Sequence, residues 1–154
     1  MINTTIFSQR DRKWANDKMG ASGLTIHNFG CTITSLSSLL CSVGYDETPK
    51  TVNRKLSARG GYAGRTALLL WGVVSAIWPR LRFVKRGYNY NNLEVSWYIY
   101  GKRTPVLVEV NGAKIGAARH WVLFLGSGKM MDPWFGRISA TNFYPLTGYA
   151  LYSL

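Results

Sequence analysis

The chain has 154 residues, 47% of them hydrophobic and 17% charged, which is enough for one packed domain and excludes a disordered tail or a coiled coil. Nineteen Lys and Arg residues against seven Asp and Glu residues give a net charge of +12. Such a surface attracts nucleic acid, an anionic membrane or an anionic cell-wall polymer. We therefore expect a single domain over residues 1–154 with possible nonspecific attraction to polyanions.

The N-terminal residues do not resemble a secretion signal, because Arg10 to Lys13 are charged and precede any apolar run. The longest apolar stretch, Ala67 to Trp78, is too short to span a bilayer. We expect no transmembrane segment and a soluble protein, cytoplasmic as synthesised. Another factor would have to deliver it to act at the cell wall.

The first half of the chain has the apolar spacing of helices. Thr32 to Val43 carries apolar residues on one helical face, and Gly44 is a plausible cap. Thr48 and Pro49 are typical of an N-cap followed by the first helical residue, which predicts a helix through Leu56. Ala67 to Trp78 is expected to be a buried helix.

After Trp78 the pattern becomes strand-like. Arg80 to Phe83 alternates basic and apolar residues, and Asn91 to Tyr100 favours a helix. Further strands are expected over Pro105–Val110, His120–Leu125, Lys129–Asp132, Gly136–Phe143 and Tyr149–Ser153. Because helices come first and strands last, we expect an α+β fold with an antiparallel sheet.

Cys31 lies between Gly30 and the start of a predicted helix. The unpaired N–H groups and partial positive charge of a helix N-terminus favour a thiolate, so Cys31 is a candidate nucleophile. Gly30 is a candidate substrate-binding residue, since it removes a side chain where a substrate backbone would approach. The alternative is that Cys31 is a small buried residue without reactivity.

Cys41 lies near the other end of the same helix, where the dipole disfavours a thiolate, and is interpreted as structural. The ten-residue separation corresponds to about 15 Å along a helix, too far for a disulfide. With two histidines and no Cys-x-x-Cys pair, we expect no metal site and no cofactor.

A cysteine nucleophile needs a base, and the sequence offers only His27 and His120. His27 falls in a loop, whereas His120 begins an apolar strand. Asp132 is the only carboxylate after Glu109 and is the candidate that orients His120.

The spacing of His120 and Asp132 fits a β-hairpin turning at residues 126–128. A three-residue loop centred on Ser127 would pair Val122 with Asp132 and place His120 and Asp132 on one face, about 7–8 Å apart. A slip of one residue would put them on opposite faces. Alternatively, Asp132 is a turn residue before Pro133.

Acyl transfer also needs donors for an oxyanion. The backbone N–H of Cys31 is one candidate, and the side-chain amide of Gln9 is another.

These segments together resemble a known family. In the first half they are Ser8 to Asp11 with Trp14, Gly20 to Ile26, and Gly30-Cys31 with Thr34 to Leu36. In the second half they are Pro105-Val106, His120 to Val122, and Met131 to Trp134 with Gly136. In this order they resemble papain-like cysteine peptidases of the bacteriocin-leader (double-glycine) type, and more closely their stand-alone relatives in bacteria and bacteriophages.

The resemblance implies a papain-like fold in which an N-terminal nucleophile helix packs on a C-terminal antiparallel sheet. It assigns Cys31 as nucleophile, His120 as base, Asp132 as its orienting residue and Gln9 as an oxyanion donor. The transporter segments of bacteriocin exporters have no counterpart here, so leader cleavage is not carried over. Residues 62–103 match no motif and are expected to shape the substrate cleft.

The predicted activity is hydrolysis of a peptide or amide bond, with a peptide or peptidoglycan-stem substrate and a phage-type role in cell-wall degradation. Processing of a soluble protein is a second possibility. The alternative class is a catalytically silent basic protein that binds nucleic acid or another polyanion. The interpretation that opposes this alternative is that Trp71, Trp78 and Trp121 belong to the core and that Arg80, Arg82, Lys85 and Arg86 form a solvated face.

Overall fold

The computed structural model describes residues 1–154 and combines five α-helices with a six-stranded antiparallel sheet. The helices are α1 (Ile26–Phe29), α2 (Cys31–Ser42), α3 (Pro49–Ala58), α4 (Trp71–Ile77) and α5 (Asn92–Ser96). A π-helical turn, η1 (Trp97–Gly101), continues α5, and a short 3-10 helix, η2 (Ala113–Ile115), precedes the third strand. No helix is both long and apolar enough to cross a membrane.

The strands are β1 (Arg82–Gly87), β2 (Val106–Val110), β3 (His120–Gly126), β4 (Lys129–Asp132), β5 (Arg137–Ala140) and β6 (Leu146–Ser153). Their order across the sheet is β1-β6-β2-β3-β4-β5. The expectation of an α+β protein with an antiparallel sheet is confirmed at this level.

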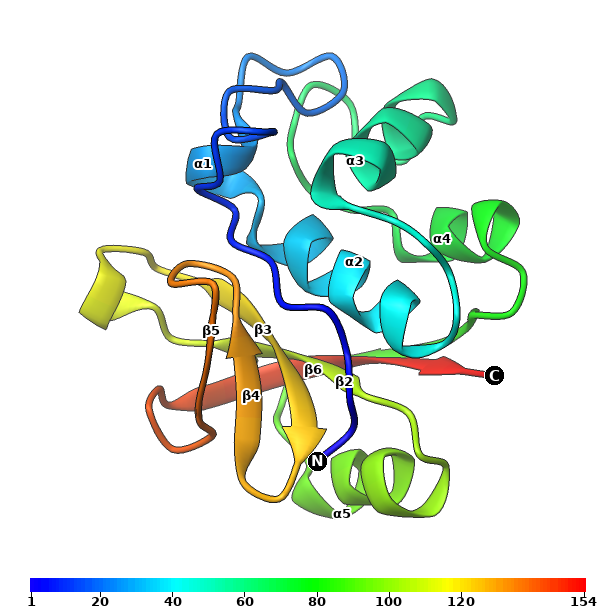
Figure 1. Ribbon diagram of the computed structural model, residues 1–154, viewed down its shortest axis with the longest axis vertical. Coiled ribbons are helices and arrows are strands. Elements are labelled where there is room, and N and C mark those ends of the chain that lie inside the picture. Colours follow the sequence, from blue (N-terminus) through cyan, green and yellow to red (C-terminus); the bar gives the residue numbers. More distant parts are fainter.

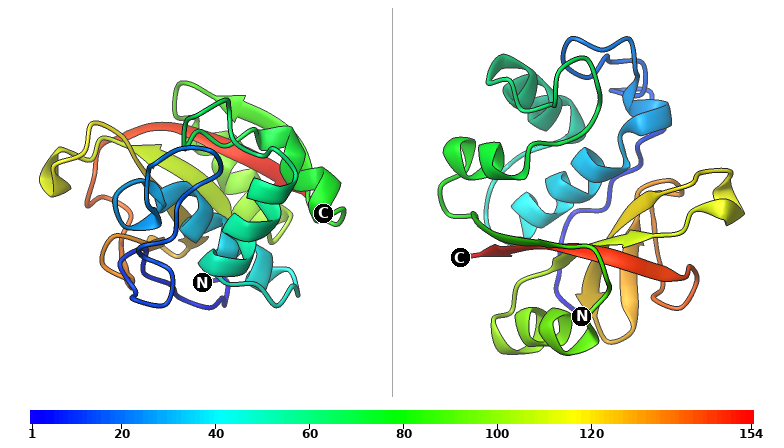
Figure 2. Two further views of the ribbon diagram at one scale, coloured as in Figure 1. Left: turned by 90° about the horizontal axis from the view of Figure 1, so that it is seen from above. Right: turned by 180° about the vertical axis from the view of Figure 1, so that it is seen from behind.

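Helices cover both faces of the sheet. Figures 1 and 2 show α2, α3 and α4 over one face and α5 against the other. Every residue of β2 and β3 is buried, which explains why these strands read as continuous apolar runs rather than as alternating patterns.

Each face of the sheet has its own apolar core. On the helical side, Leu36 and Leu40 of α2 belong to the same cluster as Trp121 and Leu123 of β3. On the other side, Val95 and Ile99 pack with a second set that includes Val122. The alternation of side chains along β3 therefore sends Trp121, Leu123 and Leu125 toward α2, and Val122 and Phe124 toward α5.

Two predicted boundaries were wrong in the middle of the chain. The helix expected over Ala67 to Trp78 begins only at Trp71, because backbone groups ahead of it pair with an earlier loop: the Ala63 N–H donates to Leu68 O at 2.9 Å and the Leu70 N–H to Gly61 O at 2.8 Å. The strand expected over Arg80 to Phe83 begins two residues later, at Arg82, and continues to Gly87, because its pairing with β6 extends that far.

The basic face expected at Arg80, Arg82, Lys85 and Arg86 is also wrong for one member. The Arg86 side chain is only 11% exposed and pairs with Glu109 of β2 at 2.9 Å. A Cβ at Gly148 on the intervening strand β6 would come within 2.6 Å of the Arg86 guanidinium, so this glycine makes room for the charge.

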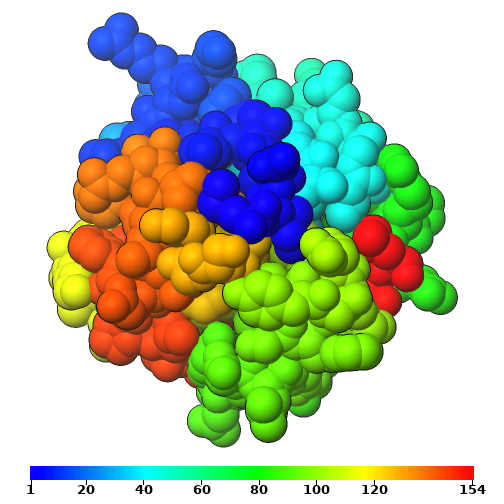
Figure 3. Space-filling model, turned by 60° about the horizontal axis from the view of Figure 1, so that its bottom comes forward, coloured from blue at the N-terminus to red at the C-terminus, as the bar shows by residue number.

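The N-terminal segment runs along the surface between the sheet and the helices. The Ile2 N–H donates to Leu125 O at 2.7 Å, and the Thr4 hydroxyl donates to Ser38 O. In the space-filling view this segment, in dark blue, lies between the orange strands and the cyan helical region (Figure 3). It thereby leads Gln9 to the end of the sheet at which β4 finishes.

Candidate active site

Cys31 is the first residue of α2 and is partly exposed. Because it opens the helix, its backbone N–H is one of the four that have no partner within the helix. Burial raises the pKa of its thiol, but the hydrogen bond and charge of His120, the Trp121 backbone and the Thr32 side chain lower it by more. The net effect holds the pKa of Cys31 below its usual range and favours the thiolate.

His120 is the first residue of β3 and is 2% exposed. Burial lowers its pKa, whereas hydrogen bonds and charges from Asp132 and Cys31 raise it to a net value of about 9. A lowered thiol pKa next to a raised imidazole pKa favours the thiolate–imidazolium form of the pair near neutral pH.

Asp132 ends β4 and is fully buried. Its Oδ1 lies 2.9 Å from His120 Nε2 and accepts the Trp134 backbone N–H at 3.0 Å, while its Oδ2 accepts the Tyr144 hydroxyl at 2.6 Å. Burial raises the pKa of Asp132, but these partners lower it overall, with His120 the largest of them. Because Nε2 faces the carboxylate, the other ring nitrogen, Nδ1, is left for Cys31.

The β3–β4 hairpin puts His120 and Asp132 on the same face, although its loop differs from the expected one. The turn has two residues, Ser127 and Gly128, with φ values of 56° and 67°, as a type I′ turn requires. A bulge between Phe124 and Gly126 adds one residue to β3, so that Leu123 pairs with Met131. This is the register that aligns Val122 with Asp132.

Gln9 is brought to the same end of the sheet and is 2% exposed. Its backbone N–H donates to Pro133 O at 2.8 Å, and its side-chain Nε2 donates to His27 O at 2.8 Å. The His27 carbonyl fixes the orientation of the amide, because a reversed amide would set two oxygens against each other. One N–H of Nε2 remains for an oxyanion, while the buried Oε1 has no partner.

Other residues of the N-terminal motif hold this arrangement. Arg10 donates to Trp134 O at 2.8 Å and stacks on the Trp134 ring at 4.5 Å, and the Trp14 indole donates to Ser8 O at 2.8 Å. The N-terminal motif at residues 8–14 and the motif at residues 131–134, which are distant in sequence, therefore lie against each other beside Asp132.

Gly30 has a packing role that the sequence did not reveal. It is buried, and a Cβ at this position would lie 2.5 Å from Ile26 O. A glycine is therefore needed where α1 meets α2, and substrate binding by Gly30 stays a prediction.

Cys41, at the far end of α2, donates its thiol to Glu47 O at 3.3 Å. His27, the other candidate base, is exposed and contributes only its backbone carbonyl to Gln9.

Cys31 opens into a groove of about 590 Å³ that His120 does not line. The loop between α3 and α4 contributes five of its sixteen lining residues, and the others come from the α1–α2 region, α4, the C-terminal end of β1, β2 and the start of β3. Its residues are Leu24, Asn28, Phe29, Cys31, Thr32, Ala63, Thr66, Ala67, Leu68, Leu69, Trp71, Arg86, Tyr88, Glu109, Arg119 and Trp121. Half of them fall within residues 62–103, the segment without a recognisable motif.

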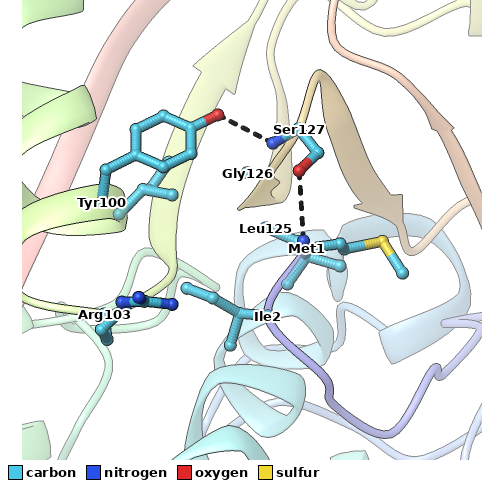
Figure 4. Close-up of a pocket in the computed structure, with 8 residues that line it drawn as sticks. Met1, Ile2, Tyr100, Arg103, Leu125, Gly126 and Ser127 are labelled. Carbon is cyan, nitrogen blue, oxygen red and sulfur yellow. Dashed lines mark hydrogen bonds between the residues drawn. The ribbon is translucent and has the colours of Figure 1, made fainter.

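A second hollow, of about 480 Å³, lies at the opposite end of β3. There the Met1 amino group donates to Ser127 Oγ at 3.1 Å and the Ser127 N–H donates to Tyr100 Oη at 2.8 Å (Figure 4). The seven residues of β3 put this hollow about 20 Å from His120, so it is separate from the candidate site.

None of the protein-family models, curated proteins or solved structures matches this chain. No group of three His, Cys, Asp or Glu side chains is arranged to hold a metal ion.

Sequence reasoning missed three residues of this site, which are Tyr144, Thr32 and Arg119. Tyr144 lies in the loop before β6, packs edge-on to the His120 ring at 5.5 Å and supplies a donor to Asp132. Nothing periodic in the sequence marks it. Thr32 directly follows Cys31, and Arg119 directly precedes His120. This adjacency to a predicted catalytic residue is the only sequence signal that could have identified them.

Proposed function

We propose that this protein is a cysteine peptidase or amidohydrolase of papain-like type, with Cys31 as nucleophile, His120 as acid and base, and Asp132 as the residue that orients His120. The observation that carries the proposal is the buried His120–Asp132 pair, 2.9 Å apart, beside a helix-terminal thiol whose pKa the imidazole lowers. A histidine with a purely structural role would not need a thiolate beside it, and Cys31 in addition lines a groove that a substrate could enter.

The first half of the reaction forms an acyl-enzyme. The Cys31 thiolate attacks the carbonyl carbon of the scissile bond, and the developing oxyanion accepts hydrogen bonds from the Cys31 N–H and the Gln9 amide. The His120 imidazolium then donates its proton to the leaving amine as the carbon–nitrogen bond breaks. The products of this half are a free amine and a thioester on Cys31.

The second half releases the acyl group. The neutral His120 removes a proton from water, and the resulting hydroxide attacks the thioester carbonyl. The carbon–sulfur bond breaks, Cys31 leaves as thiolate and His120 is again an imidazolium. Asp132 stays ionised throughout and stabilises the positive ring.

Peptide bonds in an anionic polymer, such as those in bacterial cell wall, are the substrate class that the net charge of +12 favours. We therefore propose a phage-type, wall-degrading role. The same charge supports the alternative of a polyanion-binding protein without activity, which would leave Cys31 without a function.

Purified cell wall and a random peptide library, each incubated with wild-type protein and with Cys31→Ala, separate these functions. The proposal expects new amino termini, detected by mass spectrometry, with the wild type only. A thioester or a covalent adduct with an electrophilic peptide probe should map to Cys31. Equal products from the two proteins, or an adduct on neither cysteine, would contradict it.

A further inference from the structure

The groove beside Cys31 is lined by both apolar and charged side chains. The apolar part of the lining includes Phe29, Leu68 and Trp71, and Leu68 is 67% exposed although it is a large hydrophobic residue. Exposed apolar side chains that converge on a nucleophile are suited to bind an apolar side chain of a substrate. The charged part of the lining consists of Arg86, Glu109 and Arg119.

Arg86 and Glu109 form an ion pair with each other and are not free to bind a charged ligand. Arg86 pairs with Glu109 at 2.9 Å, also donates to Gly87 O, and lies between the rings of Tyr88 at 4.3 Å and Trp121 at 4.8 Å. The other oxygen of Glu109 accepts the Thr147 hydroxyl at 3.1 Å. This pair is therefore a fixed, neutral part of the groove.

Arg119 has no such partner. Its side chain is exposed and makes no ion pair or hydrogen bond within the protein, and the only carboxylate in the groove is the one that Arg86 neutralises. The groove therefore has one uncompensated positive charge, on the residue next to His120. A planar guanidinium in this position is suited to bind a carboxylate through two parallel hydrogen bonds.

We infer that the groove binds an acidic peptide, with an apolar side chain against Leu68 and Trp71 and a carboxylate on Arg119. The inference rests on the proposed function, since it specifies the substrate of the same thiol. It makes Arg119 a specificity-determining residue rather than part of the general basic surface.

The rates at which iodoacetate and iodoacetamide alkylate Cys31 test the charge directly, because the two reagents differ mainly by one negative charge. We expect the iodoacetate-to-iodoacetamide ratio to fall about two- to fivefold in Arg119→Ala, and further in Arg119→Glu. Arg54→Ala and Arg54→Glu are matched controls: Arg54 is exposed on α3 and lies outside the groove. They change the net charge equally and should leave the ratio unchanged.

A second readout uses any peptide that the wild type cleaves, prepared in matched forms with Glu or Gln at each position. The Glu form should have the higher kcat/KM at one position, and Arg119→Ala should remove that preference while Arg54→Ala keeps it.

The two proposals fail in different ways. If Cys31 is no more reactive than Cys41 toward iodoacetamide and no peptide is cleaved, the proposed function is wrong and the inference falls with it. If Cys31 reacts rapidly but the Arg119 variants alter neither the reagent ratio nor the Glu preference, only the inference is overturned.

Discussion

His120 Nε2 lies 2.9 Å from Asp132 Oδ1, and both side chains are shielded from solvent at the end of one β-hairpin. Asp132 is itself held by the Tyr144 hydroxyl and the Trp134 N–H, so neither carboxylate oxygen lacks a donor. The bond at Nε2 therefore fixes the orientation of the His120 ring and leaves Nδ1 available to Cys31.

Substitutions of Asp132 should separate its shape from its charge. Asp132→Ala removes the acceptor of His120 and should lower kcat/KM about a thousandfold or more. Asp132→Asn keeps an oxygen for His120 and Trp134 and should retain more activity, as in other Cys-His-Asn sites. The amide has no charge, so the pKa of His120 should fall from about 9 and the alkaline limb of the pH profile should move to lower pH.

The measurement is kcat/KM against pH for the wild type and both variants. Equal losses in Asp132→Ala and Asp132→Asn, together with an unmoved alkaline limb, would show that Asp132 does not act through His120.

Tyr144→Phe should destabilise the protein in a pH-dependent way. It leaves a buried carboxylate oxygen without its donor, which costs about 1–3 kcal/mol. Tyr144 helps to lower the pKa of Asp132, so this stability is present above the pKa of an unfolded Asp and is lost as pH falls through the folded value. The difference from wild type should therefore be large at neutral pH and shrink in acid.

Urea unfolding at neutral and acid pH measures this difference. Tyr152→Phe is the matched control, because its buried hydroxyl donates at 2.6 Å to Trp71 O, a group that does not titrate. A pH-independent loss in Tyr144→Phe, like that expected for Tyr152→Phe, would refute the link to Asp132.

Gln9→Ala should reduce hydrolysis without reducing thiol reactivity. Loss of one oxyanion donor costs about a hundred- to thousandfold in kcat. Alkylation of Cys31 by iodoacetamide builds no oxyanion, so its rate should stay at the wild-type value. If both rates fall together while the thermal unfolding midpoint drops, Gln9 acts only through its structural bonds to His27 and Pro133.

The titration of His120 should depend on Cys31. The chain has only two histidines, so their ring signals are readily assigned by NMR with a His27→Gln variant. Cys31→Ala removes the hydrogen bond and charge that help to raise the pKa of His120, and the pKa should drop below about 9 while Asp132 still supports it. An unchanged titration would mean that the two groups do not interact.

The site could be outlined from the sequence because its parts lie at the ends of strongly patterned elements. Cys31 opens an apolar-faced helix, and His120 and Asp132 flank a hairpin with a clear turn signal. The expected pairing of Val122 with Asp132 was correct, although the expected turn was not. The turn has two residues instead of three, and the extra residue in the bulge of β3 restores the register. Without that bulge His120 and Asp132 would lie on opposite faces.

Other features depend on tertiary contacts that local patterns do not encode. Tyr144 reaches Asp132 from an irregular loop, and Arg86 leaves the surface only because Gly148 and Glu109 on neighbouring strands receive it. The late start of α4 likewise follows from backbone pairing of residues 61–63 with residues 68–70.

The pH dependence of alkylation at Cys31, with Cys41 as the internal reference, tests the thiolate–imidazolium pair most directly. In the wild type, Cys31 should react at pH values well below those at which Cys41 does, because His120 lowers the pKa of its thiol. In His120→Ala this advantage should disappear and the profile should shift to higher pH. A wild-type profile in which both cysteines react alike, or one that His120→Ala leaves unchanged, would contradict the account.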